Sequence, residues 1–424
     1  MKKHRFLKAF LILLITITLV ICSFIFVSGY LPVIQSNKKI DGLEGYAKNI
    51  EEIEIPGDAK IIALGEATHG NNELQLIKLE VFQHLVKQHG VRAFCLEADF
   101  GEGLLINDYI QNDNGTTEEA VKNLSFEIYH TKAFLDLITW MHDYNLNQSE
   151  SNKLSFYGFD MQNPEAAVQF LINIIDDENI KQTLSPLTSR NHKSLSDPII
   201  QKAFSLVNEI KDSFEDEVAE HAAYNIMSAY SYYSNYSNAP LEAAVFRDKR
   251  MADNVIWILD YERAKGNNSI LITAHNGHIA KNHGSLSSSL YYDNMGKLLA
   301  SQFQDAYFAI GTDYHVSLCS ARANEGFKNY KVYSENPLAA NAARVSDGYY
   351  YLSFQDVKDT NSEVYKILHA HTNVGTFAPS GYNLFYKLYF AIRPSLTRES
   401  VIIADTYDAM IVFYKLNPLD FINK

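Results

Sequence analysis

Residues 61–70 read IIALGEATHG, a short apolar run that leads directly into Glu66 and, three positions later, His69. An apolar run of this length is typical of a buried strand. Residues 73–89 follow with apolar side chains at helical spacing, and Gly90 is placed to end that helix. A second apolar run comes next, so this part of the chain predicts a β-α-β unit with an ionisable side chain at the end of each strand.

The same pattern, a short apolar run that ends in an ionisable residue, recurs along the chain. The runs end in Glu66, Glu97, Asp160, His275 and Asp313. Helical stretches over residues 164–175 and 241–264 alternate with these runs, which predicts an α/β fold with a largely parallel central sheet flanked by helices. Ligands of such sheets bind at the carboxyl ends of the strands. We therefore expect the first four of these ionisable side chains to line a common cleft on one rim.

Composition and charge limit the class of protein. The chain has 424 residues, of which 47% are hydrophobic and 21% charged, which is typical of a folded protein. Its formal net charge of -13 repels phosphate backbones, so nucleic-acid binding is disfavoured.

The amino terminus carries a basic flank followed by a long uncharged segment. Residues 9–37 contain no charged side chain, and the segment through Val27 is nearly all apolar. Such a helix can cross most of a bilayer core, and the basic flank is expected to stay in the cytoplasm. Two interpretations remain open, a retained membrane anchor or a cleaved signal peptide, because Ser28 and Gly29 are small enough for cleavage. In both cases the rest of the chain is exported, either to the outer side of the cell membrane or as a secreted protein.

We therefore divide the chain into an anchor or signal (residues 1–30), a linker (31–57) and a catalytic domain (58–418). A helical insert over about 164–264 is expected to cover the rim of the sheet. Its tyrosine-rich part, between residues 198 and 239, is interpreted first as helix packing and second as a surface for a bulky apolar ligand.

Three cysteines, Cys22, Cys95 and Cys319, are too few for a disulfide framework, although one bridge between the last two is possible. The chain has no GxSxG, HExxH, P-loop, GxGxxG or CxxC motif. Common serine hydrolases, zincins and nucleotide-binding enzymes are therefore disfavoured.

Several motifs together resemble those of the erythromycin esterase family. They are GEATHG at 65–70, GFDMQ at 158–162, the helical RDKRMADN at 247–254, AHNGH at 274–278 and DAMI at 408–411. The resemblance covers about residues 58–418 and implies hydrolysis of ester or macrolactone bonds without a cofactor.

The residues themselves also favour hydrolysis. A histidine can take a proton from water near neutral pH when a carboxylate orients it. We expect His69 to be this base, with Glu66 orienting it and Glu97 holding the attacking water. His275 and His278 are expected to stabilise the oxyanion or position the substrate. The resemblance implies similar roles for the matching positions.

Three further residues are expected to contact the substrate: Lys78, Asp160 and Arg247. Family members usually carry an arginine where this chain has Lys78, and a lysine lacks the bidentate fork. Two structural alternatives are kept open: Asp160 capping a helix near Pro164, and Arg247 with Asp248 forming a buried ion pair.

Other functions also remain open at this point. The carboxylates and histidines are sufficient in number for a divalent metal, although their spacing matches no known ligand set and we expect a metal-free site. An inactive, membrane-tethered binding module could use the same cleft. His192 and His283 are interpreted as solvated loop residues, and a buried strand is expected around residues 349–354. Oligomeric state is not predicted.

Overall fold

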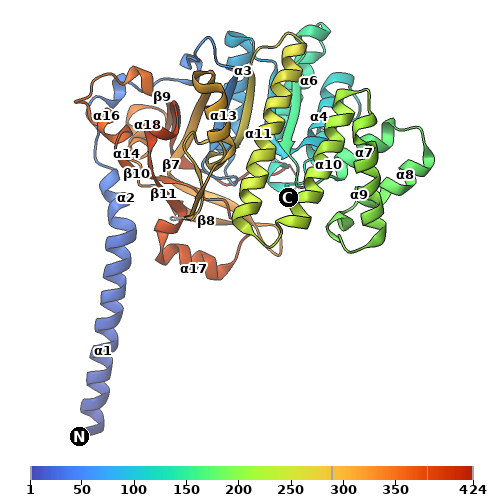
Figure 1. Cartoon of the computed structure of the whole chain (residues 1–424). Helices are drawn as coiled ribbons and strands as arrows, with labels where there is room; N and C mark the ends of the chain where they lie inside the picture. The colour runs from blue at the N-terminus through green and yellow to red at the C-terminus, as the bar shows by residue number, and fades with distance from the viewer. Residues whose placement is uncertain (1, 288–289, 380, 423–424) are drawn as a thin grey trace.

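The computed structural model describes residues 2–287, 290–379 and 381–422 and contains an eight-stranded sheet flanked by helices (Figure 1). The strands follow the order β3-β2-β4-β1-β7-β12-β9, and β8 pairs with β7. Their bounds are β1 (Ile61–Glu66), β2 (Ala93–Asp99), β3 (Ser155–Asp160), β4 (Ile270–His275), β7 (Tyr307–Arg322), β8 (Phe327–Tyr333), β9 (Tyr349–Ser353) and β12 (Ala409–Leu416). All pairings between the first six positions of this order are parallel, while β9 and β8 are antiparallel, so the predicted fold class is confirmed.

Alternate residues of each strand enter two separate cores because successive side chains point to opposite faces. In β1, Ile62 and Leu64 join the first core, whereas Ile61 and Ala63 join the second. The first core packs against α3 (Asn72–His89), α4 (Phe100–Asn112), α5 (Thr117–Lys122) and α6 (Lys132–Asn145). The second packs against α11 (Pro240–Ala264) and α13 (Met295–Phe303). Both faces are covered, which is why β1 is buried along its whole length.

A helical insert lies between β3 and β4, as expected. It comprises α7 (Glu165–Ile174), α8 (Glu178–Leu184), α9 (Pro198–Ile210), α10 (Glu217–Asn235) and α11. Its first four helices pack around an apolar cluster of their own beyond the β3 edge of the sheet (Figure 1). Only the end of α10 and the start of α11 reach the rim, so most of the insert extends the fold sideways.

Small elements follow β4 and connect the later strands. They are α12 (Asn276–Ile279), the hairpin β5 (Gly284–Ser287) and β6 (Leu290–Tyr292), α14 (Pro337–Ala340), α15 (Ala342–Val345), α16 (Glu363–Leu368), β10 (His371–Gly375), α17 (Leu384–Ile392), the 3-10 turn η11 (Pro394–Thr397), β11 (Arg398–Ile402) and α18 (Ile403–Thr406).

The amino-terminal helix projects away from the domain (Figure 1). It comprises α1 (Lys2–Ile25), η1 (Phe26–Tyr30) and α2 (Leu31–Ser36), and the stretch Arg5–Ser36 is long and apolar enough to cross a membrane. The expected linker is folded: Leu43 is buried in the second core and Ile53 in the first. Helix and domain are therefore joined by packed chain.

Two strands run further than expected. β2 continues past Glu97 to Asp99, and β7 continues past Asp313 to Arg322 because its ladder with β8 and β12 extends that far. Asp313 accordingly lies inside the fold, where its carboxylate accepts hydrogen bonds from the Gly375 backbone N–H and the Ser334 hydroxyl. The prediction that a strand ends at Asp313 was wrong.

Other details can be compared with the structure directly. His192 is fully buried with Nδ1 3.3 Å from a Glu165 carboxylate oxygen, so its prediction as a solvated residue was wrong. His283 is half-buried and packs edge-on against the Tyr291 ring. Cys95 and Cys319 are buried and unbridged, and the strand expected near 349–354 is present as β9.

Helix α4 lies against β3 through two glycines. A Cβ added at Gly103 would lie 2.1 Å from the backbone nitrogen of Gly158. We expect Gly103→Ala to lower the free energy of unfolding by about 2 kcal/mol because α4 must move away from the sheet. Gly45→Ala, where nothing lies within 4 Å of the added Cβ, is the matched control. Denaturant titration measures both, and equal stability of the two variants would contradict this packing.

Candidate active site

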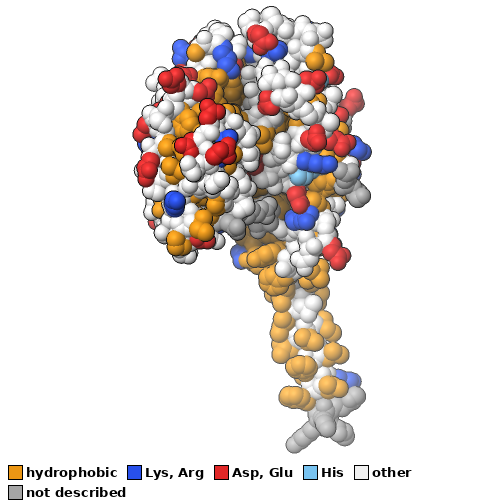
Figure 2. All heavy atoms as spheres, turned by 90° about the vertical axis from the view of Figure 1, so that its right-hand side faces the viewer, with side chains coloured by type: hydrophobic (Ala, Val, Ile, Leu, Met, Phe, Trp, Pro, Cys, Tyr) orange, Lys and Arg blue, Asp and Glu red, His pale blue; other side chains and the backbone are white. Residues whose placement is uncertain are grey.

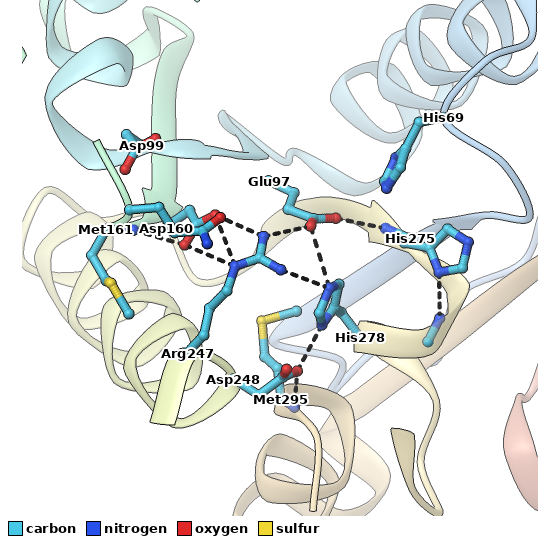
Figure 3. Close-up of polar contacts among 12 residues, drawn as sticks. His69, Glu97, Asp99, Asp160, Met161, Arg247, Asp248, His275, His278 and Met295 are labelled. Atoms are coloured by element: carbon cyan, nitrogen blue, oxygen red, sulfur yellow. Dashed lines mark hydrogen bonds and ion pairs between the residues drawn. The ribbon is translucent and has the colours of Figure 1, made fainter. Parts of the chain in front are cut away.

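The ionisable residues that end the central strands converge on one rim, as predicted (Figure 3). Glu66 and His275 are direct partners in the parallel register of β1 and β4. Asp99 is likewise opposite Asp160 in β2 and β3. The register alone therefore brings side chains from distant parts of the sequence to one edge of the sheet.

Glu66 connects His69 to Lys78. The Nδ1 atom of His69 lies 2.5 Å from Glu66 Oε1, and the Lys78 ammonium donates to Glu66 Oε2. Burial would raise the pKa of Glu66, but the charge of Lys78 and the hydrogen bond from His69 outweigh it and lower this pKa to about 2. Because Nδ1 donates to Glu66, Nε2 of His69 is left as the proton acceptor.

The pKa of His69 follows from the same pair. Burial acts to lower it, but the hydrogen bond and negative charge of Glu66 prevail, so the pKa is raised above its ordinary value of 6.5. His69 is a stronger base than a free imidazole, and its ring is neutral only above this raised pKa.

Lys78 does not occupy the substrate-binding position expected for it. Its side chain is 2% exposed, and its ammonium contacts Glu66 and the Leu74 carbonyl. Lys78 is therefore not placed for the expected direct contact with substrate. It contacts Glu66 instead, and the lysine charge keeps this carboxylate ionised.

Arg247, from α11, connects two strand ends. Its Nη2 atom lies 2.7 Å from Glu97 Oε1 and 2.7 Å from Asp160 Oδ2. Asp160 is thus held by an ion pair and does not cap α7, whose first turn lacks a side-chain cap. The buried ion pair considered for Arg247 and Asp248 is not formed either, because each turns to a different partner (Figure 3).

Asp248 holds the ring of His278 through a hydrogen bond. Its Oδ1 atom accepts hydrogen bonds from His278 Nδ1 at 2.8 Å and from the Met295 backbone N–H at 2.9 Å. Burial would lower the pKa of His278, but the charges of Asp248 and Glu97 raise it to about 10. A charged His278 donates from both ring nitrogens, so its Nε2 pairs with Glu97 Oε1 at 3.3 Å, and the 3.2 Å approach of Arg247 Nη1 is a like-charge contact.

His275 has the opposite character. Burial, reinforced by the nearby His69, lowers its pKa to about 3, so the ring is neutral at physiological pH. Its Nδ1 accepts the Gly277 backbone N–H at 3.2 Å, which places the ring proton on Nε2. That Nε2 has no hydrogen-bond partner among the described residues. It is a buried donor, and the His275 ring lies 5.0 Å from the His69 ring, centroid to centroid.

Glu97 is more enclosed than expected. Oε2 accepts the His275 backbone N–H at 2.9 Å, and Oε1 contacts Arg247 and His278. Both carboxylate oxygens are engaged, so the geometry favours a role in positioning the two histidines over direct contact with the attacking water.

The site opens into a cavity of about 1110 Å³. Arg247, His275 and His278 form its polar wall, while tyrosines from the end of α10 and residues of η11 and β11 form the opposite sides. Among the described residues, no group of three or more His, Cys, Asp or Glu side chains is arranged to hold a metal ion.

The sequence also matches a known protein family. Residues 86–416 match the family model named Erythromycin esterase. The chain belongs to the erythromycin esterase family.

Curated relatives of the family are distant. Erythromycin esterase type II of Escherichia coli is 24% identical over 61% of this chain and 69% of its own length. The putative hydrolase YbfO of Bacillus subtilis is 21% identical over 59% of this chain and 64% of its own length, so the match spans less than two thirds of that relative.

Solved structures confirm the fold. A succinoglycan biosynthesis protein aligns with a TM-score of 0.71 at 20% identity, covering 91% of this chain and 98% of that chain. A mutant of the erythromycin esterase EreC in its open conformation aligns with a TM-score of 0.53 at 17% identity, covering 88% and 94%.

Two acidic groups of this erythromycin esterase family member were missed as site residues. Asp248, which holds His278, was visible beside Arg247 in the helical motif, but its partner lies 30 residues away. Asp99 accepts hydrogen bonds from the backbone and side chain of Asn163, and the strand was expected to end before it. The second acidic residue, two positions after Glu97, was the available signal.

The charge of His278 can be tested in the folded protein. We expect His278 to stay protonated through pH 9, and Asp248→Asn to lower its pKa toward the ordinary value because the largest stabilising charge is removed. Imidazole NMR titration measures this. Asp253→Asn, on the same helix and paired with Lys249, is the control. A native His278 that titrates near 6.5 would contradict the assignment.

Proposed function

We propose that this protein is an exported hydrolase of carboxylic ester or lactone bonds in which His69 activates water. The observation that carries the proposal is the hydrogen-bonded Glu66–His69 pair, whose imidazole ring lies 5.0 Å from the neutral ring of His275, centroid to centroid. Membership of the erythromycin esterase family and the two hydrolase relatives support a hydrolase. The substrate proposed first is a macrolactone, in line with the printed name of the Escherichia coli relative.

In the proposed reaction, His69 Nε2 takes a proton from water and the resulting hydroxide attacks the ester carbonyl carbon. His275 Nε2–H and the positive charges of His278 and Arg247 stabilise the oxyanion that forms. The C–O bond then breaks, and the proton held by His69 passes to the leaving alkoxide. One water is consumed, and an acid and an alcohol are released.

The reaction class is tested by incubating the full-length protein in detergent with a panel of macrolides and simple esters. Mass spectrometry should detect a substrate that gains one water. A panel in which no ester or lactone changes mass would count against the proposal.

The base is tested by mutation. We expect His69→Ala to lower turnover by about 10²- to 10⁴-fold, the usual contribution of a general base, with an unchanged melting temperature. His369→Ala, at the exposed residue that directly follows α16, is the matched control. Comparable turnover of the two variants would remove His69 from the mechanism.

The pH profile gives an independent test. Because Glu66 raises the pKa of His69, activity should rise with pH through a midpoint above 6.5 and then level off. Glu66→Gln should move this midpoint downward and reduce turnover, since the base loses both its negative partner and its orientation. A midpoint that does not move would mean that another group is titrating.

Export is also part of the proposal, supported by the apolar span Arg5–Ser36 and the basic residues before it. Protease added to intact cells should digest a carboxyl-terminal tag. A tag digested only after lysis would place the domain on the cytoplasmic side.

A further inference from the structure

Helix α17 exposes an apolar surface next to the base of the membrane-spanning candidate helix. Leu384, Phe385 and Leu388 are 64%, 68% and 58% exposed, and Tyr386 and Ile392 are also exposed. In Figure 1, α17 lies on the side of the domain from which α1 projects, and in Figure 2 apolar side chains cover α1 up to the underside of the domain. An apolar helix left uncovered in this way is typical of an interaction surface.

The helix is attached directly to the anchor. Tyr30 donates a hydrogen bond from its hydroxyl to the Ala391 carbonyl at 3.0 Å. Gly29 packs so closely on Pro394 that an added Cβ would lie 2.5 Å from the proline ring, and Arg398 donates to the Gly29 carbonyl. The end of α17 is thereby held at the level of residues 29–30.

Helix length places that level at the membrane surface. Residues 9–28 rise about 30 Å at 1.5 Å per residue, which equals the thickness of a bilayer hydrocarbon core. Lys8 marks the inner edge, and Tyr30 lies at the outer edge, where tyrosines are enriched. An anchor seated in this way brings α17 into the outer interface with its apolar side chains toward the lipid.

The cleft opens beside the same segment. Arg393 and Leu396, which directly follow α17, line the cavity that also contains His275 and His278. We propose that α17 dips into the outer leaflet, and that the cleft receives an amphiphilic ester or lactone whose apolar part resides in the bilayer. This proposal rests on the proposed hydrolase function and on a retained anchor. It names the class of substrate that the hydrolase would take.

Docking is tested without any substrate. Full-length protein carrying Cys22→Ser is reconstituted in phosphatidylcholine–phosphatidylglycerol vesicles and labelled at Phe385→Cys with an environment-sensitive fluorophore; Cys95 and Cys319 are buried. We expect blue-shifted emission that brominated acyl chains quench. The control, Ile199→Cys at an exposed position of α9, should show the emission of a fluorophore in water, without quenching by brominated lipid.

Equal, water-like emission at both positions would overturn the proposal. Shielding at Phe385→Cys that brominated lipid does not quench, and that grows with protein concentration, would also overturn it, because a second copy would then cover α17.

Substrate entry is tested with two esters of the same alcohol, a long-chain one held in the vesicles and a water-soluble acetate. Combined Leu384→Ser, Phe385→Ser and Leu388→Ser should lower turnover of the vesicle-held ester about tenfold, because the cleft loses its orientation on the lipid. Turnover of the acetate should stay within about twofold, since the three side chains lie outside the cavity lining. Equal loss on both esters, or none, would overturn membrane entry. A native protein that hydrolyses neither ester overturns the substrate class named here, while the macrolide and ester panel decides the proposed function and the fluorescence experiment still decides docking.

Discussion

Arg247 is the constraint on which the site depends. Its guanidinium is largely buried and neutralises Glu97 and Asp160, which lie near the carboxyl ends of two adjacent strands. Removing one partner of such a buried pair typically costs about 3–5 kcal/mol, because the remaining charges are left without compensation. The side chain therefore holds both carboxylates at once and ties α11 to the rim of the sheet. The histidines are positioned by the same contacts, since Glu97 also binds the His275 backbone and the His278 ring.

Two histidines three residues apart acquire opposite protonation states from their surroundings. His278 lies between Asp248 and Glu97 and carries a proton, whereas His275 has no carboxylate hydrogen-bonded to its ring and stays neutral. One supplies charge and the other a directed N–H group. In the proposed reaction both would act on the developing oxyanion, one through its charge and the other through its N–H group.

The positions of the rim residues could be predicted from sequence because they depend on a local rule. An apolar run of about six residues ends at the sheet edge, and parallel pairing brings such ends together. Glu66, Glu97, Asp160 and His275 follow that rule. Partners that depend on tertiary packing could not be predicted in the same way: Lys78 turns inward to Glu66, and Asp248 turns to His278 instead of its neighbour Arg247. Asp313 has the same sequence signature as the rim residues, but it lies in a strand whose pairing continues, and the chain beyond it gave no local sign of this.

The connection between α2 and the sheet is folded and packs onto the domain. Leu43 and Ile53 are buried in the two cores, so the chain between the helix and β1 is packed against the domain at both points. A domain on a flexible linker sweeps a hemisphere whose radius grows with linker length. A domain on a packed connection keeps one face toward the membrane. With the anchor retained, as proposed, the packed contacts of this connection set the orientation of the domain. Lengthening the connection between α2 and β1 would change the reach of the domain and leave every residue of the cleft in place.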